Sequence, residues 1–314
     1  MDARLGRWVK AAGSALAIVS VVFIAALFWK ERVVLSTFRP GAAGIAALAL
    51  SAMGYGLLGW VLADAWRQLL LWSGETNVPS SYTRRIYAQT QIAKYIPGNV
   101  AQFAGRQVIG RQAGWTHTGL LLSTVFELLS LVCVAAAIAA VTIATGAHDA
   151  LAWKLLVAGG IAAAFVAGGV TALRISPRLL GGRWPDVAHR LASLRLRDLW
   201  PVAAYHTLFF ITSGLLFIVV TAVTTGKPVA YEHWPKLIGL LSIAWIVATL
   251  TPGAPSGIGV REMMLVAGLA FMTTTDKAIL IATLWRAVTV GGDLLFFLSA
   301  GFRTSKITLS PPQA

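Results

Sequence analysis

Residues 94–107, KYIPGNVAQFAGRQ, combine a Pro-Gly pair with polar amides and with a cation near each end. Such a stretch suits neither a membrane helix nor an ordinary surface loop, because Pro97 lacks a backbone N–H and Gly98 admits helix-breaking backbone angles. It lies in a chain of 314 residues that is 57% hydrophobic and only 12% charged. Soluble domains carry about 25% charged residues, so we expect the bilayer to be the solvent of this protein.

Seven apolar runs meet or approach the length of about 20 residues that a membrane span requires. They are residues 11–29, 41–63, 118–147, 155–173, 202–226, 237–251 and 278–302. The chain is therefore predicted to be an all-α polytopic membrane protein with seven transmembrane helices plus re-entrant segments. Eight helices are the alternative, with residues 262–273 as the extra crossing. That stretch is too short to span alone and long enough for a re-entrant half-helix.

The net charge of +14 collects at the ends of the apolar runs, as the positive-inside rule describes, and is not the footprint of a nucleic-acid-binding protein. Cations precede the first run and fill residues 73–117 and 174–200. This pattern predicts a cytoplasmic N-terminus and places both of those segments in the cytoplasm. The basic segment 174–200 has interleaved Leu and Trp, so we expect it to lie on anionic headgroups as an interfacial helix.

The opening stretch has a counterpart later in the chain. PGNVAQFAGR ends at Arg106 and PGAPSGIGVR ends at Arg261, so both read Pro-Gly, seven residues, Arg. The helices that follow also align, with THTGLLLSTVFE starting at Thr116 and TDKAILIATLWR starting at Thr275. We interpret the chain as one integral membrane domain with an internal repeat. Repeat 1 covers about residues 41–147 and repeat 2 about residues 202–302.

Transporters are often built from such repeats, and Gly/Pro-interrupted segments in corresponding positions indicate the substrate site. Backbone freed by a break is tolerated at membrane depth only where it is buried in protein or lines a wet cavity. A helix N-terminus beyond the break favours an anion, and Arg106 and Arg261 add planar donors that match phosphate. The alternative is that both stretches are cytoplasmic turns with ordinary positive-inside arginines.

Three charges lie within apolar runs, where an ionised side chain costs about 2.5–3.5 kcal/mol and normally faces a partner or a pathway. They are Glu127, Arg286 and Asp293. Glu127 and Arg286 occupy equivalent positions of the two repeats, so we expect them to pair, with Arg106 and Arg261 as the other candidate partners of Glu127. The alternative role for these charges is a structural ion pair without substrate contact.

The candidate substrate-binding residues are the polar and helix-breaking residues of the two stretches and the charges near them. They are Arg106, Arg261, Glu262, Glu127, Arg286, Asp293, Asn99, Gln102, Pro97, Gly98, Pro252 and Gly253. No catalytic constellation, cofactor or metal site is expected, because the five His are scattered and there is one Cys. No P-loop occurs, so no ATPase within the chain is expected.

KYIPGNVAQFAGR with FELLSLV after it, and TPGAPSGIGVRE later, resemble the transmembrane region of the lysylphosphatidylglycerol synthase family, also called the flippase-like domain family. The resemblance runs over roughly residues 45–300 and concerns a member without the synthase domain. It implies a polytopic protein of the bacterial inner membrane that moves or handles lipids or glycolipids. Lysyl transfer is not implied, because the synthase region is missing from this sequence.

The leading functional hypothesis is a flippase or transporter that moves a phospholipid or glycolipid headgroup across the bilayer. The expected partners are membrane lipids and a separate lipid-modifying enzyme, and no nucleic acid. The alternatives are a membrane transferase and an accessory subunit for a lipid-linked synthase or glycosyltransferase.

Overall fold

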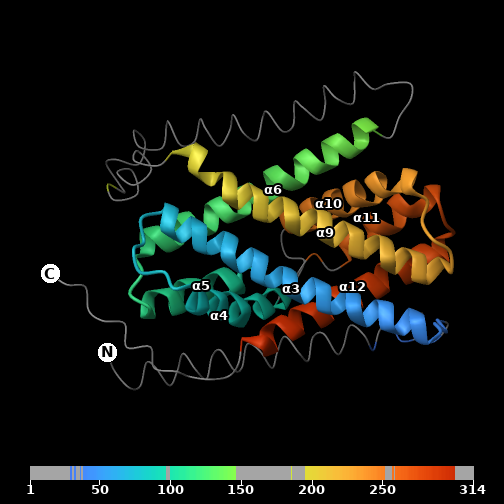
Figure 1. The fold of residues 1–314 in the computed structure, drawn as a ribbon, viewed down its shortest axis with the longest axis horizontal. Coiled ribbons are helices and arrows are strands. Elements are labelled where there is room, and N and C mark those ends of the chain that lie inside the picture. Colours follow the sequence, from blue (N-terminus) through green and yellow to red (C-terminus); the bar gives the residue numbers. More distant parts are fainter. Residues whose placement is uncertain are drawn as a thin grey trace.

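The computed structural model describes residues 38–96, 100–145, 195–251, 257 and 259–300, with Trp29, Arg32, Ser36 and Pro185. These residues form helices and no strand (Figure 1). The helices are α3 (Ala42–Trp72), α4 (Ser80–Gln91), η1 (Ile92–Tyr95), α5 (Ala101–Gln112), α6 (His117–Thr145), η2 (Leu196–Leu199), α9 (Trp200–Thr225), η3 (Tyr231–His233), α10 (Trp234–Leu250), α11 (Val260–Gly268), η5 (Leu269–Phe271) and α12 (Thr275–Ser299).

Within the described part of the chain, five helical segments are long and apolar enough to cross a membrane. They are Ala42–Trp72, His117–Thr142, Arg197–Thr225, Tyr231–Leu250 and Thr275–Ser299. Five of the seven predicted apolar runs are thus confirmed as long helices. The other two, residues 11–29 apart from Trp29 and residues 155–173, lie outside the described residues.

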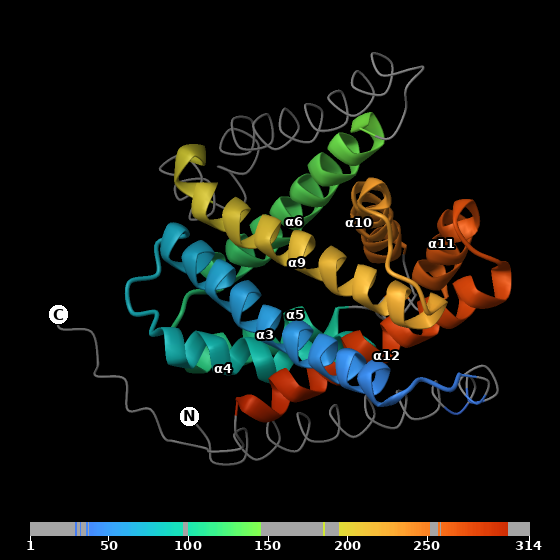
Figure 2. The same ribbon diagram turned by 45° about the vertical axis from the view of Figure 1, so that its right-hand side comes forward.

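The long helices run in two opposite directions. In Figure 1, α3 and α12 run from right to left along the chain, and α6 and α9 run from left to right. The shorter helices α4 and α5 lie at the left end of this bundle, and α10 and α11 lie towards the right end. The turned view of Figure 2 shows the same separation of the two helix pairs.

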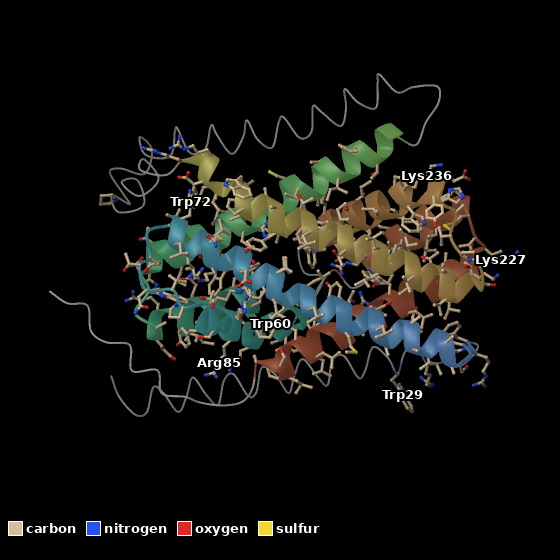
Figure 3. All side chains as sticks on the ribbon, viewed as in Figure 1. Trp29, Trp60, Trp72, Arg85, Lys227 and Lys236 are labelled. Carbon is tan, nitrogen blue, oxygen red and sulfur yellow. The ribbon has the colours of Figure 1, made fainter. Side chains whose placement is uncertain are left out.

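The segments at the left end were expected to share one side of the membrane. The Trp72 indole Nε1 donates a hydrogen bond of 3.2 Å to the carbonyl oxygen of Arg195, so the end of α3 meets the start of η2. Arg85 lies at this end, whereas Lys227 and Lys236 lie at the opposite end (Figure 3). The end of α3, where segment 73–117 begins, and residues 195–200 therefore lie at the same end of the bundle. The cytoplasmic side predicted for segments 73–117 and 174–200 stays a prediction. Residues 174–194, apart from Pro185, lie outside the described residues.

The two halves of the chain have the same element order. A long helix (α3 or α9) precedes a shorter one (α4 or α10), then a short helix (α5 or α11) and a second long helix (α6 or α12). Their neighbours correspond as well, because α4 packs against α3, α5 and α12 whereas α10 packs against α9, α11 and α6. If each helix is replaced by its counterpart in the other half, the same helix pairs are in contact.

Glycine allows α3 and α12 to approach closely, as small residues do at contacts between membrane helices. A Cβ atom added to Gly292 on α12 would lie 2.7 Å from the carbonyl oxygen of Ala52 on α3. A Cβ atom added to Gly56 on α3 would lie 2.8 Å from the carbonyl oxygen of Gly292. Both neighbours are backbone atoms, so the helices would have to separate to admit a methyl group.

We therefore predict that alanine at two adjacent positions of α12 changes the free energy of unfolding differently. Gly292→Ala should lower the free energy of unfolding by about 1–3 kcal/mol, because it overpacks the contact with α3. Gly291→Ala is the control, since its Cβ would meet only the Ala52 Cβ at 3.6 Å. It should be neutral or stabilising, because alanine favours helix by about 1 kcal/mol over glycine. Denaturant titration of the purified variants measures both, and equal stabilities would contradict the close α3–α12 contact.

Candidate functional site

A cavity of about 390 Å³ is lined on one side by α4 and α5 and on the other by α10 and α11. One part of its wall comes from the end of η1 and the start of α5, with Lys94, Val100 and Gln102. Another part comes from the end of α10 and the start of α11, with Thr249–Thr251 and Arg261. Residues on both sides of each predicted break therefore line one cavity.

The breaks themselves lie outside the described residues. This applies to five of the candidate residues: Pro97, Gly98, Asn99, Pro252 and Gly253. The close approach of Gly98 to Gly253 stays a prediction. Gln102, Arg106, Glu127 and Arg261 are the candidate residues that line the cavity.

Two glycines explain the backbone path between α10 and α11, next to the second predicted break. Gly259 adopts a positive φ of 83° at the N-cap of α11, and its N–H donates to the Glu262 carboxylate at 2.6 Å. Gly257 also has a positive φ, 70°, and a Cβ atom there would lie 2.3 Å from the Cβ of Ala248 on α10. Only glycine combines this backbone angle with so close an approach, so the chain can return along α10. Arg261 follows at the first turn of α11.

Arg106 is held in a buried cluster on α4, α5 and α6. Its side chain is 1% exposed and forms an ion pair of 2.5 Å with Glu127, which is 2% exposed. The Tyr87 hydroxyl donates to the second carboxylate oxygen of Glu127 at 2.7 Å. The guanidinium also donates to Gln91 at 3.2 Å and lies 3.7 Å from the centroid of the Tyr87 ring. Both charges are therefore paired and hydrogen-bonded, which a buried ion pair requires.

The basic partner expected for Glu127 is confirmed, but the first candidate is wrong. Glu127 on α6 pairs with Arg106 on α5, whereas Arg286 on α12 pairs with Glu262 on α11. Each long helix is thus bonded to the short helix that precedes it, and the polarity is reversed between the halves. Equivalent positions in a repeat are related by its symmetry and need not touch, which is why the alignment suggested the wrong pair.

Arg261 differs from Arg106 in its lack of partners. Its buried Nε has no hydrogen-bond partner, and no ion pair of its side chain occurs among the described residues. The residue lines the main cavity and also a small adjoining pocket with Glu262 and Arg286. A buried N–H without an acceptor is uncommon and costs about 1–3 kcal/mol, so the Arg261 Nε is a candidate donor to an anion in the cavity.

Asp293 lies behind the cavity wall in a second polar cluster. Lys94 approaches the Asp293 Oδ2 at 2.7 Å, and the Tyr95 hydroxyl donates to the same oxygen at 2.6 Å. Lys94 lines the cavity whereas Asp293 does not. The substrate-binding role predicted for Asp293 therefore reaches the cavity only through Lys94.

Sequence reasoning did not include several cavity residues among the candidates. Lys94 was visible as the cation at the start of the quoted stretch, and its adjacency to Tyr95 before a break was the available signal. The remaining ones carry no such signal because they lie in ordinary helical sequence: Tyr55, Tyr87, Gln91, Phe103, Phe209 and Trp245. Among the described residues, no group of three His, Cys, Asp or Glu side chains is placed to hold a metal ion.

Comparison with protein-family models and with curated proteins finds no match for this chain. The resemblance to the flippase-like domain family therefore rests on the quoted motifs.

The Arg106–Glu127 pair should make a large contribution to stability, whereas a more exposed pair should not. Glu127→Gln or Arg106→Gln leaves one buried charge unpaired, which costs about 3–5 kcal/mol. The control is the pair between Arg84 and Asp64, whose side chains are 40% and 21% exposed. Breaking it with Asp64→Asn should cost at most about 1 kcal/mol.

A double-mutant cycle in denaturant measures these energies, with Glu127→Gln/Arg106→Gln as the double variant. We expect a coupling energy well above that of the Asp64–Arg84 cycle, run with Asp64→Asn and Arg84→Gln. Equal coupling in the two cycles would contradict the burial of the Arg106–Glu127 pair.

Proposed function

We propose that this protein is a multi-pass membrane transporter that moves the anionic headgroup of a phospholipid or glycolipid across the bilayer. The observation that carries the proposal is one cavity that combines apolar walls with a few charged groups. It is bordered by residues on both sides of each predicted helix break, and its wall contains an arginine N–H without a partner among the described residues. A transporter with repeats binds its substrate in such a place.

The charge of the cavity supports an anionic substrate. Its described wall carries three cations, Lys94, Arg106 and Arg261, and one carboxylate, Glu127. Arg106 is already paired with that carboxylate, so Arg261 is the main free donor. A guanidinium binds phosphate with two parallel hydrogen bonds, which suits a phosphodiester headgroup.

The apolar part of the wall suits the lipid beyond its headgroup. Phe103, Leu128, Phe209 and Trp245 line the cavity beside the polar groups. A pocket that is mostly apolar with a few placed polar groups is the usual form of a small-molecule site. The acyl chains would remain in the bilayer while the headgroup passes, and no metal or cofactor takes part.

We further propose that the two halves are inverted repeats and that each inserts a broken hairpin from its own side of the membrane. In this topology α4 and α5 enter from one side and α10 and α11 from the other. The opposite directions of α3 and α9, and the exchange of helix neighbours between the halves, support this arrangement. The count of seven to eight crossings expected from the sequence includes residues 237–251 as a span. If α10 is instead one arm of a hairpin, six of the seven apolar runs cross the membrane. A cytoplasmic N-terminus and a bacterial inner membrane are part of the same proposal.

Membership of the flippase-like domain family, with a separate enzyme that makes the lipid, is part of the same proposal. A membrane transferase and an accessory subunit are the alternatives. Reconstitution separates the three, because a transferase yields a covalent product and an accessory subunit is active only with its partner.

The test is a liposome assay with phosphatidylglycerol that carries a fluorescent acyl chain, whose outer-leaflet population is quenched by dithionite. Wild-type protein should make nearly all of the probe accessible. Arg261→Ala should abolish this movement, and Arg261→Lys should restore little of it because lysine lacks the planar fork.

The matched controls are Arg197→Ala and Arg197→Lys, since the Arg197 side chain is 74% exposed. Both should behave as wild type. Normal flipping by folded Arg261→Ala protein would remove this arginine from the path. Failure of folded wild-type protein to move this lipid, or a glycolipid probe, would contradict the proposed function.

A further inference from the structure

Lys94 connects the cavity to a buried carboxylate. Its side chain lines the cavity, and its ammonium lies 2.7 Å from the Oδ2 of Asp293. Asp293 is 6% exposed and does not line the cavity. An anion in the cavity and the Asp293 carboxylate therefore compete for the same ammonium group.

Few other groups can stabilise the charge of Asp293. From η1, the Tyr95 hydroxyl donates one hydrogen bond to it. From α3, the neutral Tyr55 lies within electrostatic range. From α11, Arg261 lies within electrostatic range of Lys94 and Tyr95, the two residues that contact Asp293, and it also faces the cavity.

Several other ionisable groups on the helices around α12 have partners of their own. Arg286 pairs with Glu262, and Arg106 and Tyr87 are bonded to Glu127. On α4, Arg84 is bonded to Asp64. On α9, His206 forms a hydrogen bond with Ser130 of α6.

We propose that Lys94 exchanges Asp293 for the phosphate of an incoming headgroup and that Asp293 then takes up one proton, so that lipid binding is coupled to proton uptake. This inference rests on the proposed function. In the exchange, the ammonium keeps its charge and moves from carboxylate to phosphodiester. The proton comes from hydronium or buffer acid in the bulk solvent, which becomes water or buffer base, and it reaches Asp293 through the cavity. An O–H bond forms at the carboxylate, and nothing is oxidised or reduced.

The physical reason is the cost of an unpaired carboxylate in an apolar bundle. A buried ionised group without a partner neutralises itself instead of remaining charged. When the headgroup occupies both Lys94 and Arg261, the Tyr95 hydroxyl is the one described group that still donates a hydrogen bond to Asp293. Protonated Asp293 can keep that hydrogen bond, because a carboxylic acid retains an acceptor oxygen.

The coupling gives the protein an energy source without an ATPase. Headgroup and proton would occupy the site together and leave it together, so a proton gradient would favour headgroup movement in the direction in which protons flow. Reciprocity between the two ligands is required by linkage, so a bound proton should in turn strengthen lipid binding.

The experiment is calorimetric titration of the full-length protein with dihexanoyl-phosphatidylglycerol in buffers that differ in ionisation enthalpy. The phosphodiester does not titrate near neutral pH, so protons taken up belong to the protein. Wild type should take up about one proton per lipid bound, as the dependence of binding enthalpy on buffer reports. Asp293→Asn should bind at least as tightly with no uptake, and Lys94→Gln should bind at least tenfold more weakly with no uptake.

The control is Asp64→Asn, which removes a carboxylate outside the cavity and should leave uptake unchanged. In liposomes, a proton gradient should accelerate flipping by wild type and not by Asp293→Asn. Binding without proton uptake by wild type, or full uptake by Asp293→Asn, would overturn this inference and leave the proposed function in place. Absence of binding altogether would instead count against the proposed function.

Discussion

The structure depends on one constraint, which is that a broken helix in an apolar bundle must find partners for its freed backbone groups. In hydrocarbon each unsatisfied N–H or C=O costs several kcal/mol, so a break is stable only against protein or water. Residues on both sides of each predicted break line one cavity, where Gln102 and Thr251 supply polar side chains, and we propose that this arrangement meets the constraint. In this proposal, the requirement that makes the breaks tolerable also creates the candidate site.

Charge placement follows from the same constraint. Each short helix after a break is bonded to the next long helix by an ion pair, Arg106–Glu127 in one half and Glu262–Arg286 in the other. Each pair uses one cation and one carboxylate. Among the described residues, the Arg261 Nε is left without an acceptor, and we propose that this asymmetry makes one side of the cavity receptive to an anion.

The sequence predicts much of this architecture, because long apolar runs and Pro-Gly breaks act locally. Five long helices lie where the runs were found, and residues on either side of the predicted breaks line the cavity. Which side chains pair depends on tertiary packing, which the sequence pattern does not show. The prediction that Glu127 pairs with Arg286 was therefore wrong. The contact between Tyr95 and Asp293 joins residues 198 positions apart, and no local pattern indicates it.

The most direct test of the account asks whether the two flanks meet on the transport path. Gln102→Cys and Thr251→Cys are introduced together in a Cys133→Ser background, since Cys133 is the only cysteine. The pair at opposite ends, Arg85→Cys with Lys227→Cys, is the control. A short bifunctional thiosulfonate should join the first pair in membranes and stop lipid flipping, and reduction should restore it. Absence of the cross-link, or flipping at the full rate by cross-linked protein, would contradict a transport path between the two breaks.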